Sequence, residues 1–100
     1  MNNRQKLVQK RFLNNEKAVI NRLEQVYAQS QQDLEEAIKS LTFKIGELQE
    51  KYDWLDPDDP EREKIKSMIQ SKIYQKQYQE QLKEQVDGIL DQLQRYILST

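Results

Sequence analysis

The two prolines of the chain lie three residues apart, and the short stretch around them is the feature that most constrains the fold. Pro57 and Pro60 each follow an aspartate, Asp56 and Asp59, and the long segments on either side hold no proline. A proline disfavours the helical conformation in the residue before it and suits the first position of a new helix, where the preceding aspartate can cap the helix. The stretch therefore predicts the end of one helix and the start of another.

The four aspartates of this stretch could also suggest a calcium-binding loop. That motif needs a central glycine and a glutamate at its twelfth position, and both are missing here. Capping is the better explanation of the acidic residues.

Turn-forming residues are scarce in the rest of the chain. The 100 residues include two glycines and two prolines. A sheet-based fold needs a turn about every 8 to 12 residues, and this chain has too few turn-forming residues to connect the strands of a sheet. We expect an all-α protein.

Apolar residues upstream of the turn recur in alternating steps of four and three, which is a heptad pattern. They are Leu34, Ile38, Leu41, Ile45, Leu48, Tyr52 and Leu55. Further upstream the series reads Ile20, Leu23, Tyr27 and Ser30, which predicts a stutter at Leu34. The matching downstream stripe is Ile65, Ile69, Tyr74, Tyr78, Leu82, Val86, Ile89, Leu93 and Tyr96 or Ile97.

Two long helices with one apolar stripe each must fold back on one another to bury the stripes. We therefore expect a long antiparallel, coiled-coil-like helical hairpin in which facing residues have numbers that sum to roughly 116. Leu48 then lies near Met68, and Gly88 lies near Ala28. We expect Trp54 to pack as a cap on the closed end of the hairpin, with partner binding as the alternative role for this side chain.

The hairpin register leaves the first residues without a partner in the second helix, and Asn14-Asn15-Glu16 resembles a helix N-terminus. The expected organisation is a short helix or arm over residues 1–13, a long helix over 14–55, a turn over 56–60 and a second helix over 61–98. A hairpin with one seam buries little surface. We therefore expect self-association, as a dimer or four-helix bundle with Leu41, Ile45, Leu48 and Met68 among its buried residues.

Composition argues against several function classes. Histidine and cysteine are both absent, which removes the usual ligands of zinc, haem and iron, the usual general base and the reactive thiol. We expect no catalytic, metal or cofactor site, and no membrane-spanning segment, since no run of about 18 apolar residues is present. The formal net charge of -1 argues against wholesale nucleic-acid binding.

The N-terminal segment differs from the rest of the chain in charge. Residues 1–22 hold six basic side chains and one acidic side chain, and they also hold apolar residues that need cover. A solvated helix face would explain this charge, and so would a docking end for an acidic partner. The candidate docking residues are Arg4, Lys6, Leu7, Val8, Lys10, Arg11 and Phe12.

The order of these features resembles the N-terminal region of the minor head proteins of tailed phages of Gram-positive bacteria, the head morphogenesis family. The matching segments are Met1 to Gln5 with Lys10-Arg11-Phe12, Asn14 to Lys17, Leu23 to Tyr27 with Leu34 to Ile38, Tyr52 to Leu55 with Pro57 and Asp58, Ile73 to Leu82, and Gln85 to Leu90. Members of that family are several times longer, so the resemblance implies that this chain is an N-terminal fragment.

The resemblance implies a non-enzymatic role in the virion, in head assembly at the portal. The expected partners are portal or capsid proteins and, with less support, packaged DNA, and the expected locations are the phage head and the host cytoplasm during assembly. The alternatives are a coiled-coil adaptor or scaffold and a small secreted hairpin of the WXG type. The latter has a glycine two residues after the tryptophan, where this chain has Asp56.

Overall fold

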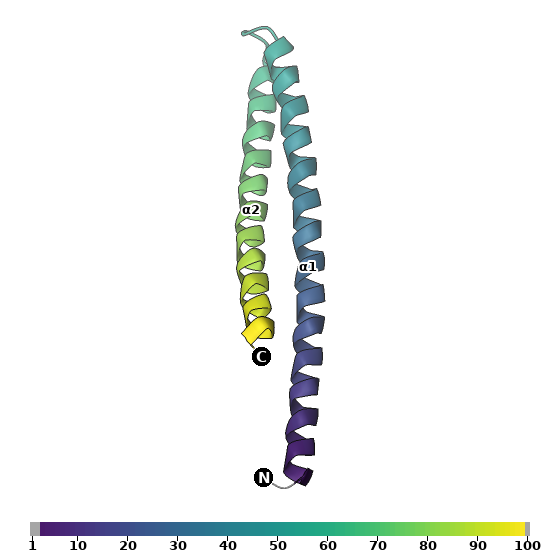
Figure 1. Ribbon diagram of the computed structural model, residues 1–100. Helices are drawn as coiled ribbons and strands as arrows, with labels where there is room; N and C mark the ends of the chain where they lie inside the picture. Colours follow the sequence, from purple (N-terminus) through teal and green to yellow (C-terminus); the bar gives the residue numbers. More distant parts are fainter. Residues whose placement is uncertain (1–2, 100) are drawn as a thin grey trace.

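The molecule is a long hairpin of two helices (Figure 1). The computed structural model describes the backbone of residues 3–99 and the side chains of residues 14–99. Helix α1 spans Asn3–Trp54 and helix α2 spans Glu61–Ser99. The two helices pack antiparallel along the length of α2, and the molecule measures 84 × 16 × 14 Å. The expected all-α antiparallel hairpin is confirmed.

The turn forms through the residues that the prolines predicted. The backbone N–H of Asp59 donates to the carbonyl of Asp56 at 2.9 Å, which closes a turn with Pro57 at its second position. The Asp59 carboxylate then accepts a hydrogen bond from the N–H of Glu61 at 2.9 Å. Asp59 is therefore the cap of α2, and Glu61 and Glu63 follow in the first turn, where carboxylates suit the positive end of the helix dipole.

The N-terminal segment differs from its prediction. Helix α1 continues without a break through Asn14 and Asn15, so residues 3–13 belong to the backbone of the long helix and do not form a separate one. Asparagine caps a helix only where the chain leaves the helical conformation before it, and here nothing interrupts the helix. Figure 1 shows the N-terminal end of α1 extending past the last residue of α2.

The inner face of α1 follows a heptad repeat. The repeat of half-buried positions is more regular than the spacing of apolar residues in the sequence predicted. From residue 20 to residue 55 the half-buried positions include an unbroken series in steps of four and three. Glu24 takes the place expected for Leu23, and Ser30 and Ala37 are half-buried beside the series members Gln31 and Ile38. The predicted stutter at Leu34 is therefore wrong. The inner face of α1 consists of Ile20, Glu24, Tyr27, Gln31, Leu34, Ile38, Leu41, Ile45, Leu48, Tyr52 and Leu55.

The inner face of α2 follows the same steps but is polar in its middle. Tyr74 and Tyr78, predicted to be inside, are 73% and 59% exposed. From the buried Ile65 and Ile69 the inner face continues in steps of three and four, because coiled-coil packing has an average period of 3.5 residues. These steps do not include positions 74 and 78. The inner face of α2 consists of Arg62, Ile65, Ile69, Lys72, Lys76, Gln79, Lys83, Val86, Leu90, Leu93 and Ile97.

Contacts across the hairpin establish its register. The Arg62 guanidinium lies 4.3 Å from the centre of the Tyr52 ring, and Lys83 Nζ lies 3.9 Å from Glu35 Oε1. Gln31 donates a hydrogen bond to Asp87. The residue numbers of these pairs sum to between 114 and 118, close to the expected 116.

The glycines have a different environment from the one expected. A methyl group added at Gly88 or at Gly46 would meet no atom within 4 Å. Gly88 therefore makes no close contact with Ala28, and the expected small-on-small contact is wrong.

Candidate interaction surface

The hairpin has two long edges, one on each side of the contact between α1 and α2, and different residues meet across the helices at each edge. On one edge, Lys44 and Lys51 of α1 line a groove with Met68 of α2. On the other edge, Lys83 reaches Glu35, and Asp87 receives the Gln31 amide. Because the inner faces keep a strict seven-residue period, residues seven apart lie on the same edge throughout.

The first edge becomes apolar away from the turn. In steps of seven from Lys44 and Lys51 towards the N-terminus, α1 presents Ala37, Ser30 and Leu23. In the same steps from Met68, α2 presents Gln75, Leu82, Ile89 and Tyr96. We call the part of this edge between residues 19–37 of α1 and 78–96 of α2 the apolar face. It consists of Val19, Leu23, Val26, Ser30, Asp33 and Ala37 with Tyr78, Leu82, Gln85, Ile89, Gln92 and Tyr96.

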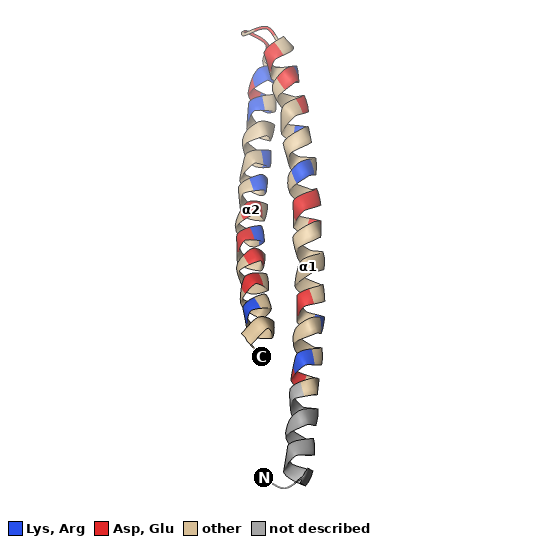
Figure 2. Cartoon of the chain, viewed as in Figure 1, with Lys and Arg blue, Asp and Glu red and all other residues tan. Residues whose placement is uncertain are grey.

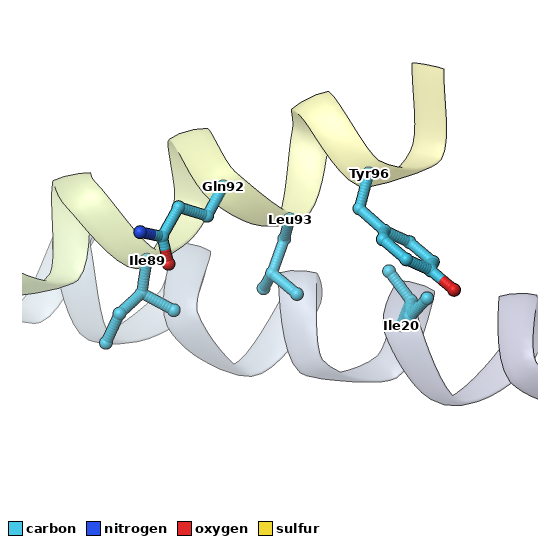
Figure 3. Close-up of a pocket in the computed structure, with 5 residues that line it drawn as sticks. All are labelled: Ile20, Ile89, Gln92, Leu93 and Tyr96. Atoms are coloured by element: carbon cyan, nitrogen blue, oxygen red, sulfur yellow. The ribbon is translucent and has the colours of Figure 1, made fainter. Parts of the chain in front are cut away.

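Apolar side chains on this face are exposed to solvent. The exposed fractions of the side chains are 59% for Val19, 57% for Val26 and 42% for Leu23. An open pocket between the helices lies at the C-terminal end of the face, lined by Ile20, Ile89, Gln92, Leu93 and Tyr96. Figure 3 shows the Tyr96 ring reaching from α2 towards Ile20 of α1.

Tyr96 also joins the two helices at this end. Its hydroxyl donates a hydrogen bond to a carboxylate oxygen of Glu16 on α1. This hydrogen bond to the neutral phenol, together with desolvation and the charge of Glu16, raises the pKa of Tyr96. The contact fixes the tyrosine ring at the edge of the apolar face.

The apolar face holds a single charged residue, Asp33, which accepts a hydrogen bond from Gln29 at 3.0 Å. The opposite edge over the same length is acidic. The acidic residues there are Glu35, Glu80, Glu84, Asp87 and Asp91. Figure 2 shows the charged residues spread along both helices and the acidic turn at the closed end.

The residues proposed from the sequence have different outcomes. The candidate docking residues Arg4, Lys6, Leu7, Val8, Lys10, Arg11 and Phe12 have side chains outside the described residues. Trp54 does not cap the hairpin, because its side chain is 88% exposed. The contact that the structure shows near that end is between the Arg62 guanidinium and the Tyr52 ring, and Ile65, three residues after Arg62, is buried.

The self-association residues are also placed differently. Leu41, Ile45 and Leu48 are half-buried in the contact between α1 and α2, while Met68 is 50% exposed on the edge near the turn. Sequence reasoning missed the apolar face itself. The signal was present in the spacing of Leu82, Ile89 and Tyr96 by seven. The prediction placed all three inside the hairpin, where the structure half-buries Leu82 and Ile89 and leaves Tyr96 exposed.

Among residues 14–99, no three acidic side chains are placed to hold a metal ion. Within residues 3–99, neither helix has a stretch apolar enough to cross a membrane. The features that distinguish this surface are its shape and its distribution of charge.

Comparisons of the chain with protein-family models, with curated protein sequences and with solved structures give no match. The structure defines the class of the molecule as a two-helix antiparallel hairpin with coiled-coil-like packing.

Proposed function

We propose that this chain is a non-enzymatic structural element of a phage head, the N-terminal helical region of a minor head protein that acts in head morphogenesis at the portal. The observation that carries this proposal is the shape of the molecule together with its sparse interior. Along 84 Å, the buried side chains among the described residues are Ile65, Ile69 and Leu90, each still 5% to 9% exposed. A hairpin this long with so small a core is suited to spanning and contacting other proteins.

The N-terminal end of α1 is the proposed docking end. Facing residues sum to about 116, so Ser99 lies level with about residue 17, and roughly 20 Å of helix extends beyond it at 1.5 Å per residue. The sequence of this extension holds Arg4, Lys6, Lys10 and Arg11. Basic residues favour an acidic partner surface, of which the portal and the packaged DNA are the two candidates in a phage head.

Salt dependence separates these two partners. Binding to DNA weakens steeply and without sequence preference as salt rises, because released counterions drive it. Portal binding through Leu7 and Phe12 survives moderate salt and fails when these residues are replaced by alanine. The measurement is the affinity of the chain for the portal protein and for duplex DNA between about 50 and 300 mM salt.

Deletion of residues 1–13 in the full-length protein tests the role in the phage. We expect incorporation into heads to fall, as measured by mass spectrometry of purified particles. The matched control replaces Gln32 with Glu, an exposed change on the opposite edge, and should leave incorporation unchanged. Equal incorporation of the deletion variant and the intact protein would show that residues 1–13 are not the docking end.

The genes beside the coding sequence test the assignment to a phage separately. Portal and terminase genes upstream support it. A gene for a secretion ATPase in that position would contradict it and favour the secreted hairpin, and neighbours of neither kind would favour the coiled-coil adaptor.

A further inference from the structure

We propose that two copies of this chain pack on each other through the apolar face, with their turns at opposite ends, so that residues 19–37 and 78–96 of both copies form a four-helix bundle. At 1.5 Å per residue, this bundle is about 27 Å long. The inference goes beyond the proposed function and holds whether or not the chain belongs to a phage head.

The first argument is self-complementarity. In a symmetric dimer each surface meets a copy of itself, so a charged surface meets its own charge. The apolar face meets this condition, because its residues are uncharged except for Asp33. The opposite edge does not. Glu80, Asp87 and Asp91 there form ion pairs with Lys76, Lys83 and Arg95, and packing a second copy on this edge would remove these charged groups from water.

The second argument is the kind of residue on the face. Protein interfaces are depleted of charged residues at their centre and enriched in aromatic and apolar ones. Leu23, Val26 and Tyr96 are each more than 40% exposed, and Ile89 lies half-buried between them. Packing against a second hairpin would cover these side chains, as the core of a four-helix bundle does.

Charge favours one orientation. Around Met68 the same edge carries three lysines, Lys44, Lys51 and Lys72, and one acidic residue, Glu47. If the two turns lay at the same end, this excess of positive charge would face the same excess in the copy, and the basic N-terminal segments of the two copies would also face each other. With the turns at opposite ends, the symmetry axis passes near residue 28, and Lys44 of one copy lies about 48 Å from Lys44 of the other, level with about residue 12 of that copy. The two N-terminal segments then lie at opposite ends as well.

The test compares matched glutamate substitutions by sedimentation equilibrium. The intact chain should sediment at twice 12.1 kDa, and Val26→Glu should raise the dissociation constant at least about 100-fold, because two unpaired carboxylates would be buried near the symmetry axis. Val26 is 57% exposed in the single hairpin and glutamate is a good helix former, so the variant keeps its helix content by circular dichroism. Gln32→Glu, on the opposite edge, should dimerise like the intact chain.

Engineered disulfides test the orientation, since the chain has no cysteine of its own. Ser30→Cys, next to the symmetry axis, should form a covalent dimer under mild oxidation, and Gln32→Cys should not. The proposal is overturned if the intact chain is folded and monomeric at about 1 mM, including the case in which it binds only a different protein. It is also overturned if Val26→Glu dimerises as tightly as the intact chain, or if Gln32→Cys cross-links and Ser30→Cys does not.

Discussion

Gln31 and Asp87, 56 residues apart in the sequence, are joined across the hairpin by a hydrogen bond of 2.5 Å from the Gln31 amide Nε2 to the Asp87 carboxylate Oδ1. The second carboxylate oxygen of Asp87 accepts a hydrogen bond from Lys83 at 3.1 Å. The Gln31 hydrogen bond, followed by that of Lys83, lowers the pKa of Asp87. This group links the stability of the hairpin to pH.

The consequence for acid unfolding has a definite sign. A carboxyl group whose pKa is lower in the folded state contributes stability that is present above its unfolded pKa, near 3.8, and that is lost as pH falls through the folded value. Asp87→Asn should therefore destabilise the hairpin at pH 7, and the difference from the intact chain should shrink below about pH 4. We expect a few tenths of a kcal/mol, since the group is solvent-exposed.

Urea unfolding of both proteins between pH 3 and pH 7 measures this difference. Asp91→Asn, which removes a carboxylate that contacts Arg95 on the same helix, is the control for loss of one negative charge. If the Asp87→Asn difference is constant across this range, Asp87 does not couple pH to folding.

Replacing Lys76, on the inner face of α2, should stabilise the hairpin, whereas replacing Asp87 should destabilise it. Its side chain is 30% exposed and lies level with the apolar middle of α1, and its ion pair with Glu80 is long, at 3.9 Å. Lys76→Leu should raise the free energy of unfolding by about 1 kcal/mol, because the added apolar burial exceeds the small value of an exposed ion pair. Lys66→Leu, at an exposed position, is the control and should change stability by less than about 0.5 kcal/mol. Equal effects of the two variants would place Lys76 outside the contact.

Asp59 is expected to stabilise the start of α2 through its hydrogen bond to the Glu61 N–H. Asp59→Ala should lower the free energy of unfolding by about 1 kcal/mol, the usual cost of losing a helix cap. Thermal unfolding followed by circular dichroism measures the change. Asp58→Ala removes a neighbouring carboxylate of the turn and should have a smaller effect. If both variants lose the same stability, the negative charge of the turn and not the cap hydrogen bond is responsible.

Trp54 provides an optical test of the closed end. It is the single tryptophan of the chain and its side chain is 88% exposed. Its fluorescence should already have the long-wavelength maximum of indole in water, and Trp54→Ala should change the free energy of unfolding by less than about 0.5 kcal/mol. A blue-shifted maximum in the folded protein, or a loss of more than about 2 kcal/mol, would mean that the ring packs on the hairpin after all.

The sequence was sufficient to predict the hairpin because the turn is encoded locally. Asp56, Pro57, Asp59 and Pro60 specify the turn and the cap by their own conformational preferences. The register then follows from the position of the turn, since a short turn leaves little freedom in how two helices align. These features depend on neighbouring residues and need no knowledge of tertiary contacts.

The orientation of the α2 surface could not be predicted in this way. The prediction placed Tyr74 and Tyr78 inside because they are apolar, whereas the structure places Lys72 and Lys76 there. Lysine can cover apolar surface with its long aliphatic chain while its ammonium group stays in water, so polarity alone does not identify the inner face. The apolar face was missed for a related reason. Leu82 and Ile89 are half-buried at the rim of the contact between the helices, so the prediction that placed them inside gave no sign that they also border an exposed face.

The positions of the buried side chains also determine how the hairpin should open. Ile65 and Ile69 lie near the turn and Leu90 lies near the other end of α2, with the lysines of the inner face between them. Local opening free energies follow the density of buried apolar contacts. Backbone amides of α2 around residues 72–83 should therefore exchange with deuterium faster than those on either side. The middle of the hairpin would then unfold locally while the helices stay packed at both ends.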